Sequence, residues 1–222
     1  PGRRHVPVVG GSPGCTHTDS WHNFQISLSN MSPAPIILWF RRDLRLEDHA
    51  ALSEALKGGS PILPLYIHET ETVPSMGAAS QWWLHHALQA HEARLRALEA
   101  RLIVRQGDPA EVLAKLIAET GAKAVYASRA YDRSTDALDH TMQGFLDKRH
   151  ITWKTFGGHL MWEPTEVRNK SGKPFQVFTP FWRAQSQGFE PGKPLPAPTH
   201  WPSPQQWPAS DPLESLHLLP SI

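Results

Sequence analysis

Short apolar runs alternate with stretches of helical periodicity along most of this chain. The runs at 36–40, 62–67, 102–104, 124–127 and 151–156 are rich in apolar and β-branched residues, which is typical of strands buried within a sheet. Between them, apolar residues recur at steps of three and four, which predicts four helices. Five strands separated by four helices predict an α/β fold: a doubly wound, five-stranded parallel sheet with right-handed crossovers and strand order 3-2-1-4-5.

Several single residues refine these predicted elements. Asp48 is expected to cap the first helix, because its carboxylate can accept hydrogen bonds from free N–H groups. Asp108 followed by Pro109 predicts the start of the third helix, and Gly121 its end. Pro64 lies inside the second strand and lacks a backbone donor, so a bulge or a local break in the strand ladder is expected there.

The second predicted helix carries a stripe of leucines that includes His91. A histidine on such a stripe is expected to be a hydrogen-bonded core residue rather than a ligand. Trp82 and Trp83, at the start of the same helix, are expected to pack in the core rather than to stack on a base. His85 and His86 point to different helix faces, so no metal site is expected.

The chain divides into three parts by pattern. Residues 1–34 are rich in Gly, Ser, His and Thr, without sustained periodicity, and are expected to form a disordered amino-terminal extension. Residues 35–160 carry all the predicted strands and helices of the α/β domain. Residues 161–222 are interpreted as a connection leading to a further domain, because nine of the 21 prolines lie at 184–222.

Composition narrows the class of protein. The formal net charge is +1 with both signs mixed, so no clustered basic face for non-specific nucleic-acid binding is evident. The one cysteine, Cys15, excludes an internal disulfide framework and a cysteine-based metal site. No apolar run reaches membrane-spanning length and no signal peptide is recognised, so a cytoplasmic monomer without a membrane partner is expected.

The loops after the first and fourth strands hold the candidate binding residues. In a doubly wound sheet a ligand binds beyond the carboxyl ends of the strands, where the strand order reverses. Polar and aromatic side chains suited to a polar, partly aromatic ligand follow these two strands at Arg41, Asp43, Ser128, Tyr131 and Asp132. The alternative, which the residues alone favour, is that the charged side chains form ion pairs tying the loop to the sheet.

No self-sufficient catalytic site is recognised. The chain lacks a nucleophile elbow, a phosphate-binding glycine loop and a pair of carboxylates at the spacing of an acid and a base. Catalytic residues are therefore not assigned.

Several motifs, in order along the chain, closely resemble the DNA photolyase/cryptochrome family. They are LWFRRDLRL at 38–46, DHAAL at 48–52, GAASQWWLH at 77–85, GDP at 107–109, YD at 131–132 and VFTPFWR at 177–183. The resemblance spans about residues 35–222. It implies an amino-terminal photolyase-type α/β domain, followed in that family by an interdomain connection and a larger helical domain that holds FAD.

The resemblance also implies a function. In photolyases, reduced FAD excited by light splits pyrimidine dimers in DNA, and the α/β domain helps to hold a light-harvesting antenna chromophore. The parent protein is then expected to be a carbon–carbon lyase, with FAD in the helical domain and DNA bound only by the full-length protein. The antenna ligand would contact Arg41, Asp43, Ser128, Tyr131 and Asp132, and a methenyltetrahydrofolate is favoured over a deazaflavin because Asp132 is a carboxylate and Ala130 is not.

Two departures and two alternatives accompany this interpretation. The family often has Arg where Gln81 stands and Asn where Ser128 stands, near the expected antenna pocket. The first alternative is a cryptochrome, which signals instead of repairing. The second is a free-standing α/β nucleotide-binding protein that uses Arg41 and Arg42 for phosphate.

Overall fold

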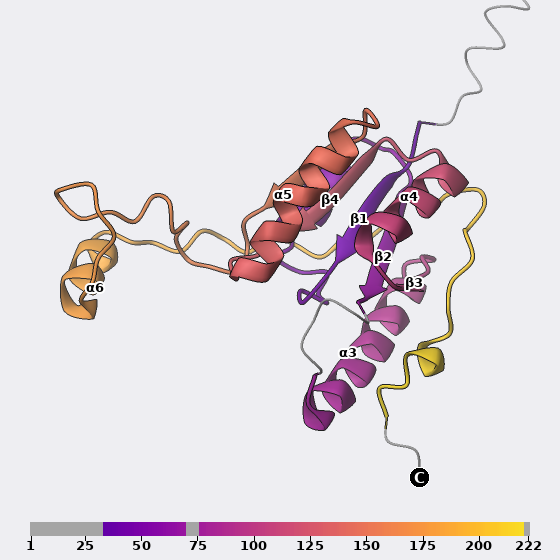
Figure 1. Cartoon of the computed structure of the whole chain (residues 1–222), viewed down its shortest axis with the longest axis horizontal. Helices are drawn as coiled ribbons and strands as arrows, with labels where there is room; N and C mark the ends of the chain where they lie inside the picture. Colours follow the sequence, from indigo (N-terminus) through magenta and orange to yellow (C-terminus); the bar gives the residue numbers. More distant parts are fainter. Residues whose placement is uncertain (1–32, 70–75, 220–222) are drawn as a thin grey trace, which may run out of the picture. The chain divides into compact units, whose positions relative to one another are not determined.

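A five-stranded sheet with parallel pairing between all its neighbours organises the chain, in the order β3-β2-β1-β4-β5. The structure, a computed structural model, describes residues 33–69 and 76–219 (Figure 1). The strands are β1 (Ile36–Phe40), β2 (Ile62–His68), β3 (Ile103–Gln106), β4 (Ala124–Ser128) and β5 (Thr152–Phe156). The predicted fold class and strand order are confirmed, with strand ends displaced by one or two residues.

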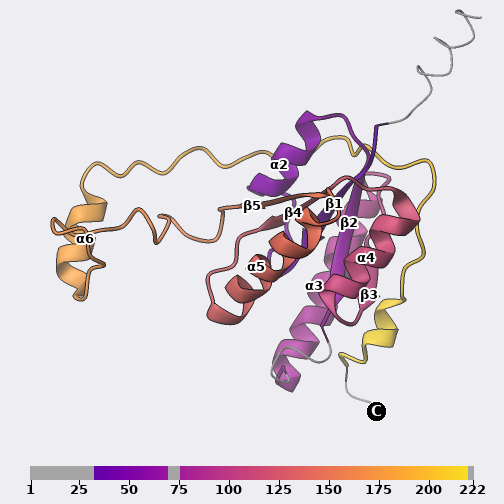
Figure 2. The same cartoon turned by 45° about the horizontal axis from the view of Figure 1, so that its top comes forward.

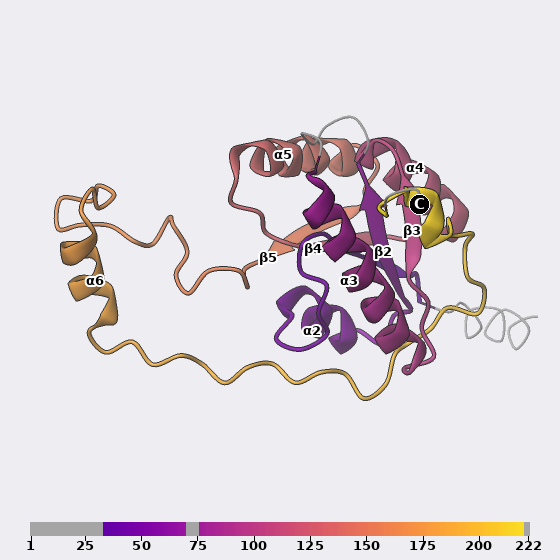
Figure 3. The same ribbon diagram turned by 90° about the horizontal axis from the view of Figure 1, so that it is seen from below.

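Helices cover both faces of the sheet, as Figures 2 and 3 show. They are α2 (Ala50–Lys57), α3 (Ala78–Arg96), α4 (Pro109–Thr120), α5 (Arg133–Asp147) and α6 (Phe178–Ser186), with a 3-10 turn at η1 (Leu213–Leu216). Alternation along β1 separates two cores: Leu38 and Phe40 pack with residues of α2 and α3, whereas Ile37 and Trp39 pack with residues of α4 and α5. None of the residues of α6 is buried.

The expected bulge at Pro64 is absent. Pro64 pairs with Leu38 in an uninterrupted register between β1 and β2. On the other side of β2, pairing with β3 begins only at Leu65. At Pro64, β2 is therefore paired with β1 only. Because β3 does not pair at this position, the missing N–H of the proline breaks no hydrogen bond to β3, and no bulge is needed.

The first helix is capped by His49 and not by Asp48. Nδ1 of His49 accepts a hydrogen bond from the Leu52 N–H at 3.2 Å. Asp48 instead adopts a positive φ of 47° and holds a later segment. Its N–H donates to the Leu195 carbonyl at 2.8 Å, and its carboxylate accepts the Leu195 N–H at 3.2 Å. The caps predicted for α4 are confirmed: Asp108 accepts the N–H groups of Ala110 and Glu111, and Gly121 closes the helix at φ 69°.

The long helix α3 differs from the prediction at its start. Trp82 and Trp83 are 50% and 71% exposed, so the expectation that they pack in the core is wrong. The buried side of α3 runs through Leu88, His91 and Leu95. Because an α-helix turns by about 100° per residue, the two tryptophans lie on other sides of the helix. His91 is buried as expected, but neither ring nitrogen has a hydrogen-bond partner within the described residues.

Part of the proline-rich region packs against the α/β domain, which its composition did not predict. Trp201, Leu216 and Leu218 are buried in the same core as α2 and α3. Trp201 Nε1 donates to the Ile62 carbonyl at 3.0 Å, which fastens the segment to the start of β2. The expectation for residues 1–34 lies, apart from the last two, outside the described residues. No helix in the described ranges is long and apolar enough to cross a membrane.

Candidate functional site

The carboxyl ends of β1 and β4 lie next to each other because the two strands pair in register, with Trp39 opposite Ala127. The two loops that leave them therefore start at the same edge of the sheet. All five candidate residues lie in these loops or at the last position of a strand. The two loops that carry the candidate residues therefore lie side by side.

Asp43 is the centre of a buried polar network. Its side chain is inaccessible to solvent, and Oδ2 lies 2.8 Å from His49 Nε2. Oδ1 accepts the backbone N–H of Arg41 at 3.0 Å. Burial raises the pKa of Asp43, but hydrogen bonds from His49, Ser128 and the Arg41 N–H outweigh it and hold the pKa well below its usual range. Asp43 is therefore a buried, ionised carboxylate.

The two ring nitrogens of His49 contact different groups. Because Nδ1 accepts the N–H of Leu52 at the start of α2, it carries no proton. Nε2, on the other side of the ring, lies 2.8 Å from Oδ2 of Asp43. The same histidine thus caps a helix and orients the carboxylate. The sequence could not indicate this pairing, because it depends on how the loop between β1 and α2 turns back.

Arg41 points into the interface between the sheet and α5. Its guanidinium pairs with Asp139, and it lies 4.3 Å from the ring centre of Trp39 and 5.6 Å from that of Trp153. The ion-pair alternative is therefore realised for this residue. Nε and Nη1 of Arg41 are buried without a hydrogen-bond partner in the described part of the chain.

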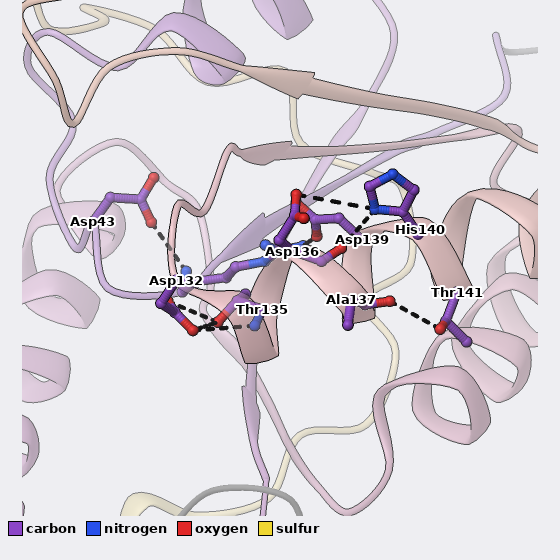
Figure 4. A network of polar contacts seen from close by, with 9 residues as sticks. Asp43, Asp132, Thr135, Asp136, Ala137, Asp139, His140 and Thr141 are labelled. Carbon is purple, nitrogen blue, oxygen red and sulfur yellow. Dashed lines mark hydrogen bonds and ion pairs between the residues drawn. The ribbon is translucent and has the colours of Figure 1, made fainter. Parts of the chain in front are cut away.

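Asp132 begins α5 and remains half-open to solvent. Its carboxylate accepts the Thr135 N–H at 3.1 Å and the Thr135 hydroxyl at 2.8 Å. It also lies 3.8 Å from the exposed guanidinium of Arg42, a weak ion pair. Figure 4 shows Asp132 with Thr135 at the start of the helix and Asp43 beside them. The side chains after β1 and β4 thus meet at one place.

Glu163 joins the site from a segment that the sequence did not single out. It accepts the Tyr131 hydroxyl at 2.7 Å and pairs with Arg129 at 2.8 Å. Gly157 leaves the space for it, since a Cβ there would lie 2.6 Å from Glu163 Oε1. Burial, followed by the hydrogen bond to Glu163, raises the pKa of Tyr131 to about 12, so the phenol stays neutral. No motif in the sequence marks Glu163, because its partners lie more than 30 positions away.

The side chains at this edge of the sheet include an acceptor, a cation and an aromatic ring that a polar ligand could contact. Asp132 offers a partly exposed carboxylate as an acceptor, Arg42 an exposed cation, and Tyr131 a partly exposed ring. Asp43 and Ser128 are buried beside them. Among the described residues, no group of three or more His, Cys, Asp or Glu side chains could hold a metal ion.

Comparison with known proteins decides the family. The profile of the family described as DNA photolyase matches residues 36–200. A deoxyribodipyrimidine photo-lyase from Agrobacterium fabrum is 41% identical over 86% of this chain and 40% of its own length. The chain belongs to the DNA photolyase family.

A solved photolyase structure and a plant cryptochrome also resemble the chain. The crystal structure of a bacterial class III photolyase from Agrobacterium tumefaciens superposes with a TM-score of 0.82 at 40% identity, covering 86% of this chain and 39% of that one. Cryptochrome-1 from Arabidopsis thaliana is 35% identical over 73% of this chain and 24% of its own length. The chain therefore spans about two fifths of the length of the photolyases it matches, and the matched segment includes the α/β domain and much of the segment that follows it.

Proposed function

We propose that this chain is the antenna-binding α/β domain of a deoxyribodipyrimidine photolyase, an enzyme that repairs pyrimidine dimers in DNA with light. The observation that carries the proposal is the 41% identity to a protein of that name across 86% of the chain. Residues 161–222 then connect the domain to a helical domain that holds FAD and carries out the chemistry. On this proposal the chain by itself has no lyase activity, and the full-length protein binds the damaged DNA.

The antenna chromophore would lie over the carboxyl ends of β1 and β4. Such a group, when bound, absorbs light and passes the excitation to the flavin. Asp132 would accept hydrogen bonds from the amino and ring N–H groups of a pterin, and Tyr131 would contact the ring. Asp43 and Ser128 would form the floor beneath it. Arg41, which pairs with Asp139, would contribute by holding α5 and thereby Asp132 in place.

A folate is favoured over a deazaflavin on the chemistry of one loop. Asp132 presents a carboxylate that is 43% exposed, which suits donors on a pterin. Ala130, two residues earlier, cannot accept a hydrogen bond through its side chain. A folate would also bring an anionic tail, and Arg42 places an exposed cation at the same edge of the sheet.

The chromophore assignment is tested by reconstitution of the full-length protein with methenyltetrahydrofolate and, separately, with a hydroxydeazaflavin. Because Asp132 also caps α5, Asp132→Ala would remove both the cap and the ligand contact. Asp132→Ser keeps a capping oxygen and removes the carboxylate. Folate uptake that falls at least tenfold in Asp132→Ser, with unchanged thermal stability, is the expected result. Tight deazaflavin uptake, or folate binding indifferent to both changes, would overturn the assignment.

The repair activity is tested separately. The full-length protein, with its flavin reduced, should convert cyclobutane pyrimidine dimers in an oligonucleotide to the monomers under blue light. A cryptochrome is the second candidate, since cryptochromes from Arabidopsis thaliana share 35% identity with the chain. Full-length protein that holds reduced flavin but leaves the dimer intact would favour that candidate.

A further inference from the structure

One edge of the sheet is covered by part of the proline-rich region, and we refer to residues 201–218 as the edge strap. β3 stands first in the strand order, so its outer edge has no neighbouring strand in the described sheet. The edge strap, drawn in yellow, runs past this side of β3 in Figures 1 and 2. The outward backbone groups of an edge strand are a template for pairing with another chain. The contacts that the strap makes with β3 therefore decide whether this edge is available.

The edge strap satisfies the outward backbone groups of β3 at Val104. The Val104 N–H donates to the Ser210 hydroxyl at 2.9 Å, and the Val104 carbonyl accepts the Asp211 N–H at 2.9 Å. The Ser210 hydroxyl also lies 3.3 Å from the Leu102 carbonyl, two residues earlier along the same edge. The strap thus occupies the position that a sixth strand would take, without being a strand itself.

The edge strap is anchored at both of its ends. At its start, the Ile62 N–H donates to the Pro202 carbonyl at 2.8 Å, and the Trp201 ring donates to the Ile62 carbonyl at 3.0 Å. At its other end, Leu216 and Leu218 are buried in the same core as residues of β3 and α3. Release of the strap would therefore uncover an apolar surface together with the edge of β3.

The opposite edge of the sheet is protected in a different way. β5 carries Lys154 at its centre with an exposed side chain, and a lysine on an edge strand opposes pairing with another strand. In β3, Ile103 and Val104 are buried, and the one cation, Arg105, is neutralised by Glu119 at 2.7 Å. β3 has no such charge of its own, so it depends on the edge strap for protection.

We propose that the outer edge of β3 is a pairing surface for a second copy of this chain, and that the edge strap masks it within each copy. The N–H and the carbonyl of Val104 both face the strap, and two opposed residues in an antiparallel pair can exchange both hydrogen bonds. A two-fold axis beside Val104 would join each N–H to the carbonyl of the other copy. The same pair would cover the apolar surface that the strap leaves.

The test releases the end of the edge strap in the 222-residue chain with Leu216→Asp/Leu218→Asp, because two carboxylates are costly in an apolar core. Gel filtration with light scattering gives the mass over a range of protein concentrations. The variant should dimerise at concentrations at least about tenfold below those at which the parent does. Leu160→Asp/Leu219→Asp makes the same change of charge at two exposed leucines and should behave as the parent.

Hydrogen exchange of the Val104 amide shows which surface is used. In the parent this N–H is held by Ser210, so Ser210→Ala should speed its exchange at least about tenfold, and unchanged exchange would refute the masking. In the Leu216→Asp/Leu218→Asp variant, the amide should exchange fast in the dilute monomer and slowly in the dimer. A variant that stays monomeric with a fast Val104 amide, or a dimer in which that amide stays fast, would overturn the proposal.

A further substitution tests the geometry of the pair. Val104→Pro removes the outward N–H, and proline is tolerated where the N–H of an edge strand faces outward. Added to Leu216→Asp/Leu218→Asp, it should abolish the dimer, and a dimer that survives it would contradict pairing at Val104. The inference goes beyond the proposed function and does not rest on it, since none of these measurements involves a chromophore or DNA.

Discussion

His49 joins Asp43 to the start of α2 through both of its ring nitrogens. Nε2 lies 2.8 Å from the Asp43 carboxylate, and Nδ1 accepts the Leu52 N–H at 3.2 Å. The loop that begins with Arg41 is therefore anchored at its buried acidic side chain and at the helix that follows. Without this contact, a carboxylate with no exposed surface would lose one of its main hydrogen-bond donors.

Replacing His49 should destabilise the domain through two contributions that different variants can separate. His49→Ala removes the helix cap, worth about 1 kcal/mol, and leaves Asp43 buried without its partner, for a total loss of about 3–5 kcal/mol. His49→Asn retains a capping oxygen, so it should cost about 1 kcal/mol less. Urea unfolding of the chain at pH 7 measures both. A loss below 1 kcal/mol in His49→Ala would show that Asp43 needs no partner.

Stability should fall with acidity below neutral pH because of His91. Burial is the largest cause that lowers the pKa of His91 from 6.5 to about 4, with the nearby Arg94 acting in the same direction and Asp43 against it. Between these values the unfolded chain binds the proton and the folded one does not. The contribution of the neutral His91 to the free energy of unfolding is therefore complete above pH 6.5. About 3 kcal/mol of this free energy is lost as the pH falls toward 4.

The measurement for His91 is the free energy of unfolding in urea at pH 7 and pH 4.5. His91→Leu should reduce the difference between the two pH values, since a leucine fits an apolar site and binds no proton. His86→Gln, on an exposed position of the same helix, is the control and should leave the difference unchanged. A pH dependence that survives His91→Leu in full would assign the effect to other groups.

The carboxyl-terminal part should be protected where it packs and cleaved where it does not. Limited proteolysis is expected to cut within 184–200, which has few buried side chains, and to spare 201–218. Trp201→Ala should cost about 3–5 kcal/mol and open the second range to cleavage, because it removes a buried ring and its bond to the Ile62 carbonyl. Trp182→Ala, at an exposed tryptophan of α6, should change little. Early cuts throughout 201–218 in the parent chain would contradict the packing.

A methyl group at Gly157 should disturb the contacts of Glu163. Gly157→Ala places a Cβ 2.6 Å from Glu163 Oε1, so the carboxylate must move away from Tyr131 and Arg129. A loss of about 1–2 kcal/mol is expected. Gly144→Ala has nothing within 4 Å and lies inside α5, so it should stabilise the domain by about 0.5–1 kcal/mol. Thermal unfolding compares the two, and a neutral Gly157→Ala would show that Glu163 is not held there.

The layout of the sheet could be predicted from local pattern because each element carries its own signal. The uninterrupted apolar run of β1 and the leucine stripe of α3 indicate directly which residues are buried. The cap at Asp108 and the closing Gly121 depend on neighbouring residues only. The nearness of the loops after β1 and β4 followed from strand order, which in this topology places them side by side.

The errors arose where the decisive partner is distant in the sequence. Asp48 has the right chemistry for a cap, but Leu195 offers it two backbone hydrogen bonds and His49 caps the helix instead. Trp82 and Trp83 are apolar enough for a core, yet they fall outside the stripe that faces the sheet.

The sequence by itself determined the family, the α/β architecture and the edge of the sheet where a ligand would bind, because these depend on motifs and on local periodicity. Only the tertiary structure decided how the polar side chains are used. It turns Arg41 toward Asp139 and brings Glu163 to Tyr131. Polar contacts of this kind join residues separated by tens of positions, and their geometry exists only once the hydrophobic layers have fixed the loops in space.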